Sequence, residues 1–334
     1  MWKFLLIAAV ATLPPKMELD KARPLADQQG FLDELHARQA WQTTRGRPDV
    51  VVAVLDGGVD DTHPDLKGQV LQGPNFTSFA GGGLDISGQG HGTHIAGVIA
   101  ANGKVSGVAP GVRVLALRVE VPEYENGAFT GIAPEPHAMA RAIRYAAFEG
   151  HARVINYSGG VPADPEVRAA TAEAMRAGVL FCVSAGNAGR DSYAQDTPNL
   201  DMTCALVVHG LDHQDQLAGF SNYGDPRGIC APALDLLSTM PLSPNPFNGE
   251  GRSRYGRYGI HTGTSSATPC TAGVAALVYS ALADARHVSP TAIAGLEVAK
   301  ILRTTARHLG DTGPNPRYGV GAVDAAAAVA ACKR

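Results

Sequence analysis

The stretch "VVVAVLDGGVDDTHPDL", residues 50–66, begins as an unbroken apolar run and ends in small and polar residues. Its valine-rich first half has the composition of a strand that is buried on both faces of a parallel sheet. Asp56 stands at the end of this run and is followed at once by two glycines. An isolated Asp at a strand end often only caps a turn. Because reactive groups gather at the carboxyl ends of parallel strands, however, we interpret Asp56 as a candidate functional carboxylate.

The same apolar pattern recurs along the chain and alternates with helical patterns. Further apolar runs lie at 112–119, 152–157, 178–186 and 204–210. Helical patterns lie at 91–101, 134–149, 165–177, after Ser265, near 290–308 and near 321–331. This alternation predicts an α/β fold with a doubly wound, mostly parallel sheet and helices on both faces.

The chain shows no internal linker that would divide it, so we expect one domain over residues 21–334. In residues 1–20, Lys3 is followed by an apolar stretch of signal-peptide length, residues 4–13, which is too short to span a bilayer as a helix. This segment predicts a leader and a secreted or periplasmic protein, with a cytoplasmic location as the alternative.

Charge and cysteine content exclude several classes of function. The chain has 28 Lys and Arg against 31 Asp and Glu, a formal net charge of −3, which gives no reason to expect nucleic-acid or anionic-membrane binding. The five cysteines are widely spaced, without a Cys-x-x-Cys pair: Cys182, Cys204, Cys230, Cys270 and Cys332. We therefore favour buried thiols over a disulfide framework or a structural zinc site.

Two further stretches combine reactive side chains with small residues. In "SGQGHGTHIAGVIAA", residues 87–101, a glycine-rich loop leads into a helix that begins near His91. In "HTGTSSATPC", residues 261–270, Ser265 opens the long apolar helix. A carboxylate, an imidazole and a hydroxyl at such junctions are the parts of a nucleophilic catalytic triad.

With these residues the chain resembles the subtilisin-like serine peptidases, the subtilase family of S8 type. The resemblance rests on "VAVLDGGVD" (52–60), "HGTHIAG" (91–97) and "GTSSATP" (263–269), in the order acid, histidine, serine. Weaker matches extend it from about residue 30 to the C-terminus. It implies a subtilisin-like fold and a serine endopeptidase that acts on extended polypeptides, as a monomer and without a cofactor.

The resemblance also implies roles for individual residues. Asp56 would orient the imidazole, His91 would act as general base and acid, and Ser265 would be the nucleophile. Asn187, in "SAGN", falls on the position whose amide donates to the oxyanion. The segment "YSGG" would pair with the substrate backbone through Ser158, Gly159 and Gly160.

Some positions depart from the family pattern. Gly57 stands where the family usually has Thr or Ser, which predicts a less firmly held Asp56. Gly159 stands where a larger residue usually walls the cleft, which predicts a more open site. The loop from His91 to Pro110 is shorter than in members that wrap a calcium ion there. We therefore predict no metal at that loop and leave a structural calcium elsewhere open.

Rival interpretations remain. The same fold could be a catalytically idle binding module, or an exopeptidase with one end of its cleft blocked, although no insertion is evident between the motifs. His91 with His94, or His209 with His213, could be metal ligands, but the first pair lacks the flanking glutamate of a zinc-peptidase helix, and the second lies in a polar segment that we expect to be exposed. The filled acid, base, nucleophile and oxyanion positions favour the peptidase.

Overall fold

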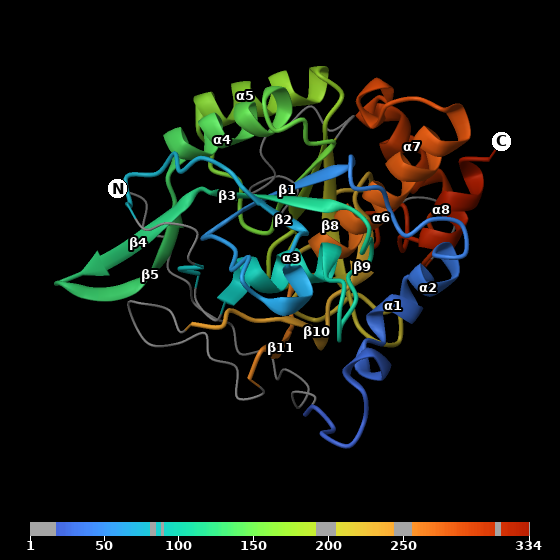
Figure 1. Cartoon of the computed structure of the whole chain (residues 1–334), viewed down its shortest axis with the longest axis horizontal. Coiled ribbons are helices and arrows are strands. Elements are labelled where there is room, and N and C mark those ends of the chain that lie inside the picture. The colour runs from blue at the N-terminus through green and yellow to red at the C-terminus, as the bar shows by residue number, and fades with distance from the viewer. Residues whose placement is uncertain are drawn as a thin grey trace.

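In the computed structural model, residues 18–80, 85–87, 90–191, 205–243, 256–310 and 315–333 are described. Residues 1–17 of the predicted leader and Cys204 lie outside these ranges. The predicted α/β class is confirmed by a seven-stranded sheet with helices on both faces (Figure 1).

All paired neighbours in the main sheet are parallel, in the order β2-β3-β1-β6-β7-β8-β9. Its strands are β1 (Val51–Asp56), β2 (Val70–Gln72), β3 (Arg113–Arg118), β6 (Val154–Tyr157), β7 (Leu180–Ser184), β8 (Ala205–Leu211) and β9 (Ile229–Pro232). The five predicted apolar runs are strands β1, β3, β6, β7 and β8. The short strands β2 and β9 were not predicted.

Alternation along β1 assigns its side chains to two cores. Val52 and Val54 pack in the core under α3 (His91–Ala100) and α6 (Thr264–Arg286). Ala53 and Leu55 pack in the core under α4 (Pro136–Phe148) and α5 (Pro165–Arg176). Because successive side chains of a strand point to opposite faces, Asp56 lies on the α3 and α6 side, where His91 is.

Helix α6 runs through the larger core. Its apolar window has a mean hydropathy of 1.3 and would be long enough to cross a membrane, but all of that window is buried inside the protein. It is therefore the core helix of this fold. Pro269 lies inside α6, so it offers no N–H to the carbonyl of Ser265 four residues earlier.

The short 3-10 helices are η1 (Leu25–Gln28), η2 (Pro64–Leu66) and η4 (Pro290–Ala292). Helices α1 (Phe31–Glu34), α2 (Ala37–Ala40), α7 (Gly295–Thr305) and α8 (Ala325–Ala331) lie at one end of the molecule (Figure 1). The first and last segments join here, because Ala325 N–H donates to Leu35 at 2.9 Å and His36 pairs with Asp324 at 2.9 Å.

Two antiparallel hairpins add to the parallel sheet. β10 (Leu236–Thr239) pairs with β11 (Tyr258–His261), and β4 (Glu120–Glu125) pairs with β5 (Ala128–Pro134). The β4–β5 hairpin stands away from the body of the protein (Figure 1). Its turn residues Asn126 and Gly127 have φ of 52° and 80°, the positive values that a two-residue hairpin turn needs. This hairpin was not predicted from the sequence.

Candidate active site

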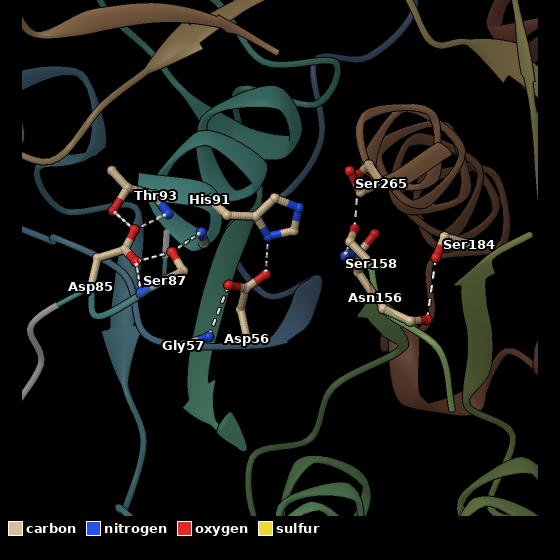
Figure 2. Close-up of polar contacts among 12 residues, drawn as sticks. Asp56, Gly57, Asp85, Ser87, His91, Thr93, Asn156, Ser158, Ser184 and Ser265 are labelled. Atoms are coloured by element: carbon tan, nitrogen blue, oxygen red, sulfur yellow. Dashed lines mark hydrogen bonds and ion pairs between the residues drawn. The ribbon is translucent and has the colours of Figure 1, made fainter. Parts of the chain in front are cut away.

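Asp56 is held in place by its own strand end and by His91. Its side chain is buried, with 3% of it exposed. The Gly57 N–H donates to Asp56 Oδ1 at 2.8 Å, and Asp56 Oδ2 lies 2.8 Å from His91 Nδ1 (Figure 2). One carboxylate oxygen is therefore fixed by the backbone and the other orients the imidazole.

Ser87 occupies the space in which a side chain at position 57 would lie. A Cβ built on Gly57 would be 2.9 Å from the Ser87 backbone nitrogen and 3.0 Å from its Cβ. Ser87 therefore packs closely against Gly57, where a side-chain hydroxyl at position 57 would otherwise lie. The Gly57 N–H bonds the Asp56 carboxylate from the backbone, and the expectation that a missing side-chain hydroxyl loosens Asp56 stays a prediction.

The first turn of α3 is fixed by Asp85, which sequence reasoning missed. Asp85 Oδ2 accepts the Thr93 N–H at 2.7 Å and the Thr93 hydroxyl at 2.6 Å. The Ser87 hydroxyl donates to Asp85 and accepts the Gly92 N–H at 3.1 Å. These bonds satisfy N–H groups that a helix start leaves unpaired, so Asp85 caps the helix that carries His91 (Figure 2).

The electrostatic environment favours a protonated His91. Burial alone would lower the pKa of His91, but the charge and hydrogen bond of Asp56 raise it to about 9, with Glu120 and Asp85 adding to the rise. Burial and the charge of Asp56 also raise the pKa of Asp85 to about 6. The imidazole therefore lies among three acidic side chains and is a strong base.

Ser265 is the second residue of α6. Because Pro269 has no N–H, the Ser265 carbonyl lacks its usual partner within the helix. The Ser158 hydroxyl donates to that carbonyl at 2.9 Å and itself accepts from Asn156 Nδ2 at 3.1 Å (Figure 2). Ser158 therefore joins the end of β6 to the start of α6 and helps to fix Ser265.

Asn187 lies beside Ser265 in an orientation set by Thr264. Asn187 Oδ1 accepts the Thr264 N–H at 2.9 Å and the Thr264 hydroxyl at 2.8 Å. A Cβ built on Gly263 would be 3.2 Å from Ser265 Oγ and 3.4 Å from Asn187 Nδ2. The amide nitrogen and the hydroxyl therefore border one small space, which a side chain at position 263 would fill.

The three side chains predicted as a triad come together from separate elements. Asp56 ends β1, His91 begins α3 and Ser265 begins α6. In Figure 2 the ring of His91 lies between Asp56 and Ser265, with Nδ1 on the carboxylate and its opposite edge toward the serine. The arrangement can pass a proton between a hydroxyl and an oriented imidazole.

The segment Ser158–Gly160 continues past the last paired residue of β6. Gly160 is exposed, with nothing within 4 Å of a Cβ built on it. The Gly159 carbonyl accepts the Ser184 hydroxyl at 3.2 Å. A Cβ on Gly159 would lie 2.7 Å from the Tyr157 hydroxyl oxygen. The Tyr157 ring therefore fills the space beside Gly159, where the sequence predicted a more open site.

The other histidines have structural surroundings. His94 is buried, stacks on His261 at 4.0 Å between ring centroids, and bonds the Leu236 carbonyl at 2.9 Å. His209 is also buried, contrary to the expectation of an exposed segment, and His213 pairs with Glu34 at 2.9 Å. Within the described residues no group of three His, Cys, Asp or Glu side chains could hold a metal ion.

An oriented acid–imidazole pair that faces a serine at a helix start, on an α/β fold, defines the class of serine hydrolases. The model of the subtilase family (Peptidase S8) matches residues 47–321. The chain therefore belongs to the subtilase family of serine proteases, as the sequence motifs predicted.

Individual relatives agree with this membership. The chain is 33% identical over 285 residues to the thermophilic serine proteinase of Bacillus sp. (strain AK1), covering 84% of this chain and 62% of that protein. It is 35% identical over 256 residues to the major intracellular serine protease of Bacillus subtilis (strain 168), covering 74% and 73%. The crystal structure of a lanthipeptide protease matches with a TM-score of 0.72 at 26% identity, covering 92% of this chain and 94% of that one.

Proposed function

We propose that this protein is a serine endopeptidase that hydrolyses peptide bonds through an acyl-enzyme intermediate. The observation that carries the proposal is the 2.8 Å pair between Asp56 and His91, whose ring faces Ser265 at the start of α6. The idle-module alternative is less well supported, because acid, base and nucleophile are all present and share one site.

In the proposed first step, neutral His91 accepts the proton of Ser265 Oγ as this oxygen bonds to the substrate carbonyl carbon. The carbonyl π electrons move to oxygen and form the oxyanion of a tetrahedral intermediate. The Asn187 amide and the Ser265 N–H, which has no backbone partner among the described residues, are suited to donate to this oxygen. Asp56 stabilises the imidazolium that results.

In the second step, the imidazolium donates its proton to the leaving amine as the C–N bond breaks, which leaves the acyl group on Ser265. Water then attacks the ester, with His91 again accepting a proton, and release of the acid restores the hydroxyl. Substrates are proposed to be extended segments, because the open segment Ser158–Gly160 can pair only with an extended backbone.

The proposal is tested by active-site labelling with a fluorophosphonate probe. We expect the wild type and Ser266→Ala to be labelled and to cleave an unfolded polypeptide, and Ser265→Ala to do neither. The neighbouring serine is a matched control, because it lies in the same turn of α6 but is buried. A folded wild type that takes no label and cleaves no polypeptide would instead support the idle module.

Export remains a prediction from residues 1–20, and so does the monomeric state. The N-terminal sequence of the mature protein, recovered from whole cells and from the medium, tests the first. Light scattering of the purified Ser265→Ala variant, which cannot digest itself, tests the second.

A further inference from the structure

Glu120 follows directly on the strand that pairs with the Asp56 end of β1. Arg118 is the register partner of Asp56, and the Val119 N–H donates to the Asp56 carbonyl at 3.0 Å. Glu120 is half-buried, and its charge acts on both Asp56 and His91. The base of the β4–β5 hairpin therefore brings a third carboxylate to the candidate active site.

Tyr157 lies beneath the segment proposed to bind the substrate. It ends β6, is 2% exposed, and its hydroxyl oxygen would be 2.7 Å from a Cβ on Gly159. Burial, followed by the charges of Glu120 and Asp56, raises the pKa of this hydroxyl well above its usual value. The phenol therefore lies against the segment Ser158–Gly160, where the charge of Glu120 also acts on it.

Among the residues that the structure describes, the Glu120 carboxylate makes no hydrogen bond or ion pair, and the Tyr157 hydroxyl makes no hydrogen bond. Glu120 is only half-buried, so its carboxylate is partly open to solvent at the candidate active site. An unpaired charged group beside the candidate catalytic residues is suited to bind a ligand.

The charge around these groups indicates which ligand. Burial and repulsion by Asp56 and Asp85 raise the pKa of Glu120, whereas His91 lowers it. The nearby guanidinium of Arg118 is directed to the Gly57 carbonyl at 3.2 Å and toward Asp85. A cation brought by the substrate would relieve the repulsion among the acids and would supply donors to Glu120 and Tyr157.

We propose that Glu120 is a specificity residue that selects a Lys or Arg side chain of the substrate close to the scissile bond. Tyr157, whose ring fills the space beside Gly159, forms the floor of this subsite. The inference rests on the proposed peptidase function and names its substrate class. A carboxylate and a guanidinium pair through two parallel hydrogen bonds, which favours Arg over Lys.

The test compares peptides that carry Arg or citrulline at each of the four positions before the scissile bond. Citrulline has nearly the shape of Arg but no charge, so the ratio of the two kcat/KM values isolates the contribution of charge. We expect wild type to prefer Arg at one position by about 10- to 100-fold, the range of a charged hydrogen bond. Glu120→Gln reduces this ratio to near one. In Glu120→Lys, a peptide with Glu at that position is cleaved better than the matched peptide with Gln.

Glu123→Gln is the matched control, because it removes the same charge from an exposed position on the same strand and keeps the preference. If wild type cleaves the Arg and citrulline peptides equally, or if Glu120→Gln keeps the ratio, the proposed subsite is overturned, but the proposed peptidase function is not affected. If Glu120→Gln shifts the pH profile but not the ratio, Glu120 acts only on His91 and the inference again fails. No cleavage of any peptide by a folded wild type overturns the proposed function itself.

Discussion

The position of Ser265 depends on a proline one turn further along α6. Pro269 leaves the Ser265 carbonyl without an N–H partner, and Ser158 supplies the hydrogen bond from another element. Asn187 is positioned similarly, because two donors of Thr264 hold its oxygen and leave its nitrogen available. The motif residues thus act through neighbours that fix their orientation.

Ser158→Ala removes the donor to the Ser265 carbonyl and the acceptor of Asn156. Loss of a buried partner costs about 1–3 kcal/mol of unfolding free energy, and here it also loosens the nucleophile, so kcat falls. The matched control is Ser280→Ala, because Ser280 bonds the Ala276 carbonyl at 2.8 Å in the same helix, away from the site. Denaturant unfolding and kcat are measured for both, and an equal loss of kcat in the two variants would contradict the role of Ser158.

Asn187→Asp keeps an acceptor for the two Thr264 bonds but removes the amide donor and adds a negative charge. We expect kcat to fall by at least about 100-fold while thermal unfolding is unchanged, a magnitude measured on subtilisin, a member of this family. Steady-state kinetics on one peptide substrate measure it. A kcat within tenfold of wild type would show that this amide does not face the oxyanion.

The pH dependence of cleavage follows from the acids around His91. His91 must be neutral to accept a proton, and its pKa is raised to about 9, so kcat/KM rises as pH increases through the alkaline range. Glu120→Gln removes one of the charges that raise this pKa and moves the midpoint to lower pH. The profile is recorded with the citrulline peptide, and a wild-type plateau reached already below pH 7 would disprove this account.

At the scale of elements, the central strands and the helices were predictable and the capping and hairpin contacts were not. Long apolar runs such as 112–119 indicate buried strands because both of their faces are covered. The β4–β5 hairpin was missed because neither strand has a regular apolar pattern: β4 reads EVPEYE and β5 reads AFTGIAP, although Asn126 and Gly127 are a strong turn signal. Asp85 was missed because a capping residue is usually sought directly before the helix, whereas Asp85 lies earlier in the loop that precedes α3.

The β4–β5 hairpin can be shortened without unfolding the protein, because its strands pair only with each other. Pro122 and Ile132 are register partners, so Asn-Gly can replace residues 123–131 and keep Glu120 in place. We expect the unfolding midpoint to stay within about 3 °C of wild type, which corresponds to about 1 kcal/mol. Scanning calorimetry on the Ser265→Ala background measures it, and a much larger drop would mean that the hairpin supports the core.

At the scale of the whole molecule, two hydrophobic cores on either face of the sheet hold the fold, and the described residues form no disulfide. Cys182, Cys230, Cys270 and Cys332, the four cysteines that the structure describes, are buried and free. The prediction of buried thiols is confirmed for these four residues. The sheet brings Asp56, Ser158 and Asn187 to one edge because their strands are parallel neighbours.

Reducing agents should therefore leave the stability unchanged. We expect the same unfolding midpoint with and without dithiothreitol, and we expect a thiol reagent to reach the four described cysteines only after unfolding. Burial raises the pKa of Cys182 to about 12, which keeps its thiol protonated and unreactive at neutral pH. A midpoint that falls on reduction would reveal a cross-link, which could then be located by mass spectrometry.

Because Ser265 belongs to a helix far along the chain from Asp56 and His91, a polypeptide emerging from the ribosome has an acid and a base long before it has a nucleophile. Under the proposed function, a new chain therefore cannot cleave peptide bonds until α6 packs against the sheet and brings Ser265 to His91. A molecule in which this packing opens would lose the proposed activity as its own chain becomes accessible to proteolysis.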